Sequence, residues 1–439
     1  MRLNGRMNAL LPFALLVLMT ATLAAEDWPQ WLGPRGDSTW NETGLITKFP
    51  AAGPKVLWRA PVANGYSGPA VSGGKVFVMD YQIATGEVDA NPGGRTALTG
   101  KERVVCLDEK SCKQLWAHAY DCAIHLSFPN GPRCSPVVAE GMVFALGAEG
   151  HLSALNVSDG KLVWEKELKQ EYKCESPMWG YAATPLVHGG LLYTLAGGSG
   201  SAVVALDAKS GKERWRALDA KDIGYAPPVM TRRGGKDELV VWHSASLNGL
   251  DPKSGKVGWS QPFDPSYGMS IMAPRVTGEG IFIGAIMKKS MMVKPGDGKP
   301  EVVWEGVPQN SLAPKNGTPV MMGEYFYGCD MDGDLRCVKT ATGERMWSTL
   351  EIMNNKKVGS GTFFMVRTPQ QWVIFNDSGE LILADLNPQG YKEAGRAKIL
   401  GADTPSMGRT VVWSHPAFAN KCVFARNDKE LVAISLAAD

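Results

Sequence analysis

Hydrophobic and polar positions along the chain recur in one short phrase. An apolar strand ends in Leu-Asp or a close equivalent, a polar turn containing Gly follows, and a second strand ends in Trp. Clear copies occupy residues 206–215 and 250–259, and further copies end at Trp116, Trp164, Trp304 and Trp347. Apolar runs separated by Gly-containing turns predict short antiparallel strands joined as hairpins.

The phrase has a period that identifies the architecture. The six tryptophans at positions 116, 164, 215, 259, 304 and 347 are separated by 48, 51, 44, 45 and 43 residues. A repeat of this length with several strands per unit is typical of propeller blades. Two or three separate β-sandwiches, the competing interpretation, leave the even period unexplained.

The remainder of each unit supplies two more strands. A Pro-containing segment of small residues is followed by a short β-branched or aromatic strand, such as residues 75–78 or 191–193, and then by a polar hairpin turn. We therefore predict an all-β fold, a single eight-bladed β-propeller with four-stranded blades. A degenerate copy near residue 395 counts as one of the eight outer strands.

The N-terminal strand predicts how the ring closes. Residues 55–59 contain Trp58 but have no strand before them in a blade, whereas residues 431–436 lack a Trp-bearing partner. We expect the N-terminal strand to join the last blade, which leaves no free sheet edge there. Docking of neighbouring blades through buried aromatic area is predicted for Trp58, Trp116, Trp164, Trp215, Trp259, Trp304 and Trp347.

Residues 1–25 have the layout of a secretory signal peptide. Arg2 and Arg6 precede an apolar run over residues 9–22 and a small-residue end at Ala24 and Ala25. The run is short for a membrane span, and the first cysteine is Cys106, so a lipid anchor is not expected. We expect an exported periplasmic or extracellular protein without a transmembrane span. Residues 26–54 form an N-terminal strap, and residues 55–439 form the propeller.

Charge excludes one class of partner. The chain has 46 Lys and Arg against 44 Asp and Glu, and removal of the leader with its two arginines leaves 44 of each. A nucleic-acid binder usually has a basic excess, so nucleic acid is not an expected partner. We expect a monomer whose partner is an envelope protein or a small molecule. The hydrophobic share of 44% is that of a globular protein.

The sequence contains no clear metal or catalytic motif. Among the eight cysteines no two are adjacent and no C-x-x-C spacing occurs. Cys329 and Cys337 flank Gly333 symmetrically and are candidates for a disulfide across a hairpin; the alternative is buried free thiols. Residues 330–334 have Gly in the fourth position rather than the sixth, so we interpret them as a hairpin turn and not as a calcium loop.

The repeated phrase resembles the pyrroloquinoline-quinone (PQQ)-like repeat. The resemblance covers about residues 55–436, in seven copies, and residues 27–37 look like the strap found in many exported proteins with such repeats. It implies an eight-bladed propeller. Members of this family include quinone-dependent alcohol and sugar dehydrogenases and also BamB, a non-catalytic outer-membrane assembly lipoprotein.

The resemblance also implies what a catalytic member would contain. The dehydrogenases hold the quinone over a Trp and beneath a disulfide of adjacent cysteines, with calcium bound by Glu, Asn and Asp. Adjacent cysteines and a haem-attachment motif do not occur here. We therefore predict an exported non-catalytic propeller that acts as a protein- or ligand-binding scaffold. The alternative is a PQQ-dependent dehydrogenase of alcohols or sugars, with PQQ and calcium as cofactors.

Candidate ligand contacts lie in the loops that precede the inner strands, because these loops meet at one end of the channel. Residues 120–133 and 172–181 are the longest and most aromatic of these loops. We expect Trp179 and Tyr181 to stack on a ligand and Arg133 to bind an anionic group; the alternative is that these loops are only stapled by cysteines. The full set of candidates is His125, Arg133, Trp179, Tyr181, Tyr225, Lys315, Asn316 and His415.

Overall fold

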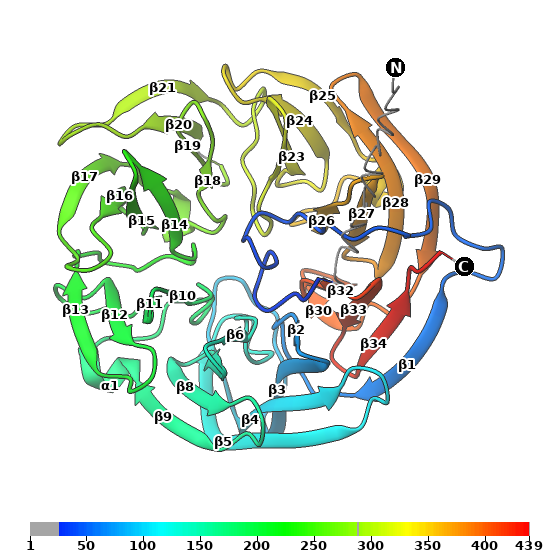
Figure 1. The fold of residues 1–439 in the computed structure, drawn as a ribbon, viewed down its shortest axis with the longest axis horizontal. Helices are drawn as coiled ribbons and strands as arrows, with labels where there is room; N and C mark the ends of the chain where they lie inside the picture. Colours follow the sequence, from blue (N-terminus) through cyan, green and yellow to red (C-terminus); the bar gives the residue numbers. More distant parts are fainter. Residues whose placement is uncertain (1–25, 288, 439) are drawn as a thin grey trace, which may run out of the picture.

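Eight four-stranded antiparallel sheets surround a central channel in the computed structural model, which describes residues 26–287 and 289–438 (Figure 1). Each sheet is one blade, and the strand that lies nearest the channel is its inner strand. This arrangement confirms the predicted all-β, eight-bladed propeller with four-stranded blades. The predicted signal peptide, residues 1–25, lies outside the described residues.

The first four blades follow one another in chain order. Blade one contains β2 (Ala70–Ser72), β3 (Lys75–Thr85), β4 (Thr96–Asp108) and β5 (Gln114–Leu126). Blade two contains β6 (Val137–Ala139), β7 (Met142–Leu146), β8 (His151–Asn156) and β9 (Leu162–Glu167). Blade three contains β10 (Leu186–His188), β11 (Leu191–Leu195), β12 (Val203–Asp207) and β13 (Glu213–Ala217). Blade four contains β14 (Val229–Arg233), β15 (Lys236–Trp242), β16 (Ser246–Leu250) and β17 (Val257–Pro262).

The last four blades complete the ring. Blade five contains β18 (Arg275–Val276), β19 (Ile281–Gly284), β20 (Ser290–Lys294) and β21 (Glu301–Gly306). Blade six contains β22 (Val320–Met322), β23 (Tyr325–Cys329), β24 (Leu335–Lys339) and β25 (Arg345–Thr349). Blade seven contains β26 (Phe363–Arg367), β27 (Trp372–Asn376), β28 (Glu380–Asn387) and β29 (Gly390–Lys398). Blade eight contains β32 (Ala417–Ala419), β33 (Cys422–Arg426), β34 (Glu430–Ser435) and β1 (Lys55–Pro61).

A few short elements lie between the blades. The remaining elements are the strand pair β30 (Thr404–Ser406) and β31 (Arg409–Val411), the helix α1 (Leu168–Tyr172), and the 3₁₀ turns η1 (Ser266–Gly268) and η2 (Glu351–Met353). In the described part of the chain, no helix has the length and apolar character needed to cross a bilayer. The middle strands of the blades, such as β7 and β27, are fully buried and form the core between neighbouring sheets.

The ring closes through strand β1, as predicted. β1 pairs antiparallel with β34, with Arg59 opposite Val432 and Ala60 opposite Leu431, and a bulge lies between Val56 and Trp58. The outer strand of blade eight therefore comes from the N-terminal side of the propeller and the other three strands come from the C-terminal side. This closure pairs two strand edges that would otherwise be exposed.

The tryptophans of the repeat lie between blades. The Trp116 indole Nε1 donates to the carbonyl oxygen of Val157 in blade two at 3.1 Å. Equivalent bonds reach the next blade from five further indoles, those of Trp58, Trp164, Trp215, Trp304 and Trp347. Trp259 differs, because its Nε1 donates to the carboxylate of Glu238 within its own blade at 3.0 Å.

Residues 26–45 cross one end of the channel (Figure 1). The Trp28 and Trp40 side chains are fully buried and pack on Phe418 of blade eight, with ring centroids 5.4 and 5.7 Å apart. Across the channel, Arg275 of blade five donates through Nη1 to the carbonyl oxygen of Gly36 at 2.6 Å. The segment is therefore attached to opposite sides of the ring.

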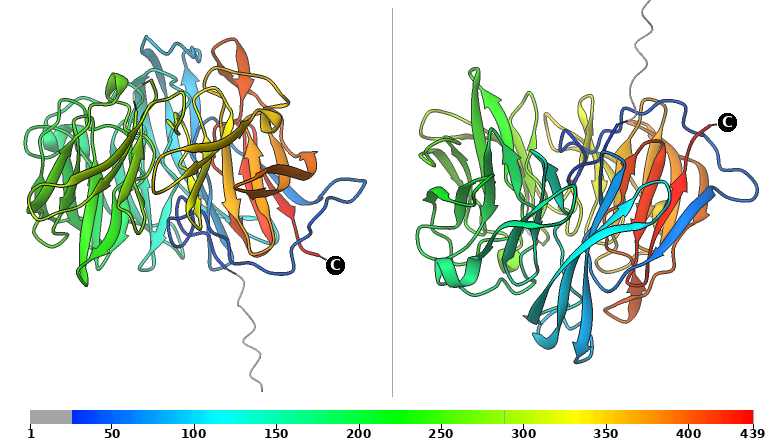
Figure 2. Two further views of the ribbon diagram at one scale, coloured as in Figure 1. Left: turned by 90° about the horizontal axis from the view of Figure 1, so that it is seen from above. Right: turned by 60° about the horizontal axis from the view of Figure 1, so that its bottom comes forward.

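The strands of blade one are longer than predicted. β4 and β5 each contain 13 residues, and their far ends project beyond the other blades (Figure 2). Residues 120–126, which we expected to belong to a loop, are therefore the second half of β5. The expected loop is confined to residues 127–133.

Candidate functional site

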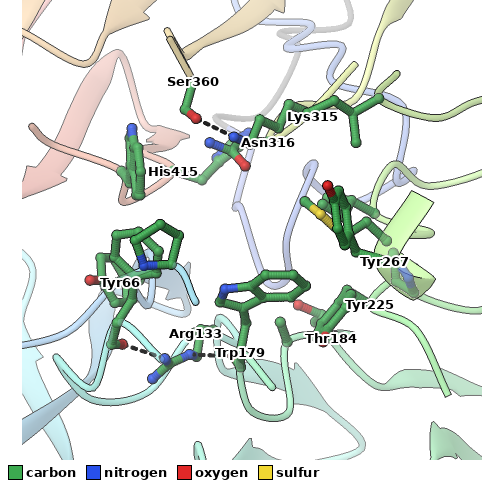
Figure 3. Close-up of a pocket in the computed structure, with 18 of the residues that line it drawn as sticks. Tyr66, Arg133, Trp179, Thr184, Tyr225, Tyr267, Lys315, Asn316, Ser360 and His415 are labelled. Atoms are coloured by element: carbon green, nitrogen blue, oxygen red, sulfur yellow. Dashed lines mark hydrogen bonds between the residues drawn. The ribbon is translucent and has the colours of Figure 1, made fainter. Parts of the chain in front are cut away.

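A cavity of about 610 Å³ lies at one end of the channel, and Figure 3 shows residues that line it. Its walls come from the loops that lead from the outer strand of one blade to the inner strand of the next. We name these the mouth loops, and we name the cavity the mouth cavity. Its aromatic lining consists of Trp31, Tyr66, Phe128, Trp179, Tyr225, Tyr267, Phe364 and Trp413. The polar side chains in the described lining are Arg133, Ser135, Thr184, Lys315, Asn316, Ser360 and His415.

The aromatic side chains pack on one another and form broad apolar walls. Trp179 and Tyr225 meet with ring centroids 5.6 Å apart and ring planes inclined at 60°. Trp413 contacts Phe128 at 5.8 Å on the other side of the cavity. Trp31 reaches the cavity from the segment that crosses one end of the channel, and its ring lies edge-on to His415 at 6.1 Å. Such walls suit a flat, apolar molecule.

Lys315 brings a positive charge to this cavity. Its Nζ donates to Ser360 Oγ, from the mouth loop before β26. Burial lowers the pKa of Lys315. The described lining contains neither Asp nor Glu, and no ion pair of Lys315 occurs among the described residues. The charge of Asp332 partly offsets the effect of burial on the pKa, but the Asp332 carboxylate is paired with Lys357 at 2.9 Å, so Lys315 has no direct carboxylate partner among the described residues.

Asn316 lies beside Lys315 in Figure 3, and His415 lies farther along, on the other side of Asn316. Asn316 donates through Nδ2 to Thr362 Oγ1 at 3.0 Å, which orients the amide. His415 Nδ1 lies 2.6 Å from the carbonyl oxygen of Pro416, so Nδ1 carries the proton and donates. Burial lowers the pKa of His415 to about 4, so the ring is neutral at pH 7. Its Nε2 is thus an acceptor.

Arg133 lies at the cavity wall, but most of its donors are already used. Its guanidinium donates to the carbonyl oxygens of Trp179 at 2.8 Å, Phe128 at 2.5 Å and Ser127 at 3.2 Å, and to that of Gly131. Four of its five N–H groups are therefore bonded to backbone oxygens. We had expected Arg133 to bind an anionic group. Its guanidinium instead holds two mouth loops together and has few N–H groups left for an anion.

Six of the eight candidate ligand contacts line the mouth cavity: Arg133, Trp179, Tyr225, Lys315, Asn316 and His415. Tyr181 does not, because its side chain is buried between blades and its hydroxyl donates to the carbonyl oxygen of Ala196 at 2.8 Å. His125 is exposed on β5, where its backbone N–H donates to Glu149 Oε1 at 2.7 Å. Neither side chain lines this cavity.

Several residues that line the cavity were not among the candidate ligand contacts predicted from the sequence. Trp31 was assigned to the strap, and its approach to the cavity depends on how the strap crosses the ring. Trp413 lies two residues before His415, in the Pro-containing segment of blade eight, and this position could have indicated it. Phe128 and Tyr267 lie farther from such segments, and Phe364 belongs to the inner strand β26, so the repeat gives no signal for them.

The candidate disulfide between Cys329 and Cys337 is absent, and both residues are buried free thiols, which is the alternative interpretation. All eight cysteines are free thiols, including Cys122, Cys134 and Cys174, so no disulfide staples the mouth loops. The hairpin register pairs Cys329 with Leu335 and Cys337 with Tyr327, which places the two cysteines two residues out of step. The offset arises because residues 330–334 form a tight turn, closed by a hydrogen bond from the N–H of Asp330 to the carbonyl oxygen of Asp334 at 2.9 Å.

The mouth cavity does not fit calcium. Calcium takes six to eight oxygen ligands and usually several carboxylates, whereas the described lining offers two cationic side chains and no carboxylate. No group of three or more His, Cys, Asp or Glu suited to a metal ion occurs among the described residues. Asp330 and Asp334, in the calcium-like turn, are both paired with Arg336 at 2.9 and 2.7 Å.

The chain is similar in sequence to curated envelope proteins. A family model described as outer membrane protein assembly factor BamB matches residues 42–223 and, in an overlapping match, residues 100–349. Outer membrane protein assembly factor BamB of Xanthomonas campestris is 27% identical over 230 residues, which cover 50% of this chain and 54% of that protein. Quinohemoprotein alcohol dehydrogenase ADH IIB of Pseudomonas putida is 35% identical over 150 residues, 30% of this chain and 19% of the enzyme.

The fold is similar to a solved member of the family. The crystal structure of BamB from Moraxella catarrhalis aligns with a TM-score of 0.56 at 14% identity and covers 87% of this chain and 97% of that one. The chain spans about half the length of curated relatives that it matches, for example 54% of the Xanthomonas protein. Because the family model covers more than half of the chain, this protein belongs to the BamB family of propellers built from PQQ-like repeats.

Proposed function

We propose that the protein is a non-catalytic propeller of the cell envelope that acts as a binding scaffold through its mouth cavity. The observation that carries this proposal is the composition of the cavity, with apolar aromatic walls, Lys315 and no carboxylate in the described lining. Concave, mostly apolar surfaces with a few placed polar groups are typical of ligand sites. A quinone-dependent dehydrogenase would need a carboxylate base and calcium ligands, and the residues described in the lining supply neither.

The location in the envelope is supported by two independent observations. The N-terminal residues have the pattern of a secretory signal peptide. The relatives with BamB names are described as outer membrane protein assembly factors. We therefore propose an exported monomer that is not anchored by a lipid and has an envelope protein or a small molecule as its partner.

Site-specific crosslinking tests the scaffold proposal. Tyr267 is 72% exposed at the cavity rim, whereas Val257 is 39% exposed on the outer strand β17 of blade four. The chain with photoreactive benzoylphenylalanine in place of Tyr267 is irradiated in the presence of an envelope extract. It should form a crosslinked product of higher mass with an envelope protein. The chain with the same group in place of Val257 should form no such product. Equal crosslinking from both positions would contradict a partner site at the mouth.

The rival function has its own test. The purified full chain is incubated with PQQ and calcium, and the reduction of an artificial electron acceptor is followed with alcohols and sugars. We expect no turnover. Sustained reduction that requires both the quinone and the substrate would replace the scaffold proposal by the dehydrogenase.

A further inference from the structure

The rim of the mouth cavity carries three exposed apolar side chains on strained backbone. Tyr267, Met287 and Met407 are 72%, 57% and 44% exposed, and all three line the cavity. Their φ angles are +58°, +56° and +45°, in the left-handed region that bulky residues rarely adopt. Phe128 and Ser360, which also line the cavity, have φ angles of +50° and +57°.

Five of the fifteen non-glycine residues with a positive φ in the described chain line this cavity, and three of these five are the exposed apolar side chains of its rim. Left-handed non-glycine residues cost conformational energy, and they persist at sites where function requires an unusual side-chain direction. Exposed apolar side chains at the rim likewise cost hydration free energy until something covers them. Together they indicate that the rim is shaped for contact with an apolar body seated in the cavity.

The charge in the cavity defines one end of that body. Lys315 and Asn316 lie on one wall, and Trp179 lies on the opposite wall (Figure 3). The Lys315 ammonium group bonds to the neutral hydroxyl of Ser360 and meets no carboxylate of the described lining. A ligand that supplies one negative charge at this wall would complete an ion pair in a sheltered place, where such a bond is strong.

We propose that the mouth cavity binds a planar, largely apolar small molecule that carries a single carboxylate. The carboxylate pairs with Lys315 and lies next to Asn316, and the apolar body extends across the cavity to the face of Trp179. The exposed side chains of Tyr267, Met287 and Met407 then cover its outer side. This inference rests on the proposed function, because it names the class of ligand for the same cavity.

Other ligand classes fit the lining less well. A cation would meet Lys315 without a compensating carboxylate, and a neutral aromatic molecule would leave the ammonium group unpaired. A ligand with several negative charges would bring into an apolar cavity more charge than Lys315 neutralises, since the donors of Arg133 are largely used by backbone oxygens.

A matched pair of probes tests this proposal. The affinities of 2-naphthoate and its neutral analogue 2-naphthamide for the full chain are measured by isothermal titration calorimetry. We expect 2-naphthoate to bind more tightly than 2-naphthamide. Lys315→Met should weaken 2-naphthoate about tenfold or more and leave 2-naphthamide unchanged, because one charge-assisted hydrogen bond is lost.

Three further variants serve as controls for this experiment. Lys253→Met, which changes an exposed lysine in the hairpin turn between β16 and β17, should leave both affinities unchanged. Trp179→Ala should weaken both probes. Lys315→Arg should keep the preference for 2-naphthoate, and it remains informative if Lys315→Met fails to fold.

Three results would overturn the proposal: no binding of either probe, equal binding of both, or an undiminished affinity of Lys315→Met for 2-naphthoate. Failure here is distinguishable from failure of the scaffold function. Crosslinking from position 267 without probe binding would retain the scaffold and remove this ligand class. Selective binding of 2-naphthoate together with quinone-dependent turnover would retain the ligand class and remove the non-catalytic function.

Discussion

The indole ring of Trp116 lies directly on the backbone of Gly160 in the next blade, where a Cβ atom would stand 2.5 Å from the ring. The same contact recurs between Trp164 and Gly211 and between Trp215 and Gly255. These glycines belong to the turn of the repeated phrase. The Trp and the Gly of the phrase are therefore two halves of one contact, made between consecutive copies of the repeat.

Gly160→Ala should destabilise the propeller by about 2–4 kcal/mol, because the methyl group meets the ring and the residue has a φ of +70°. Gly189→Ala is the matched control. Its φ is +59° with nothing within 4 Å of the added Cβ, so it should cost only about 1 kcal/mol. Urea denaturation measures both, and equal losses would show that the Trp116 contact contributes nothing.

The hydrogen bonds of Arg133 lead to a second prediction. Arg133→Met should lower the free energy of unfolding by about 2–4 kcal/mol, because four backbone carbonyl groups lose their donor. It should also weaken 2-naphthoate and 2-naphthamide to the same extent, since the loop that carries Trp179 is released. Arg232→Met, at an exposed position of β14, is the control for loss of an arginine. A selective loss of 2-naphthoate would instead assign anion binding to Arg133.

The architecture could be predicted because its determinants repeat. Seven of the eight blades carry a Trp in the outer strand, so the period and the unpaired Trp58 together indicated eight blades and their closure. Most of the site could be predicted for the same reason. Arg133, Trp179 and Lys315 lie in the loops before the inner strands of blades two, three and six, and these loops meet at one end of the channel.

The failures come from details that do not repeat. Tyr181 follows Gly180, whose φ of +71° turns the chain so that the Tyr181 ring packs beneath Gly150 instead of facing the cavity. Trp31 reaches the cavity only because the strap crosses the ring. The offset of the hairpin between β23 and β24, which separates Cys329 from Cys337, depends on a turn whose hydrogen bonds the spacing alone does not specify.

Strand β1 leads to a prediction about closure. A chain that starts at Val62 should lose far more stability than one that starts at Lys55, because the first lacks the outer strand of blade eight and exposes the edge of β34. Both chains lack the strap, so the comparison isolates β1. The expected result is a broad, low thermal transition for the shorter chain. Coincident transitions would show that closure by β1 does not stabilise the ring.

The stability of the protein should fall in mild acid because burial lowers the pKa of two histidines, His415 and His243, to about 4. His243 is the better residue to change, because it does not line the mouth cavity. Its side chain is buried, its Nδ1 accepts a hydrogen bond from the N–H of Ala245 at 3.1 Å, and burial lowers its pKa from 6.5 to about 4. Between these two pH values the unfolded chain binds a proton that the folded chain does not. The contribution of His243 to the free energy of unfolding is therefore fully present above pH 6.5 and is lost as the pH drops towards 4. The shift corresponds to about 3 kcal/mol. Urea denaturation at pH 7, 5.5 and 4 should therefore show that the free energy of unfolding falls less for His243→Gln than for the parent chain. The control His125→Gln, at an exposed position of β5, should show the same pH dependence of this free energy as the parent chain. Identical pH profiles for the parent and His243→Gln would show that another group sets the acid sensitivity.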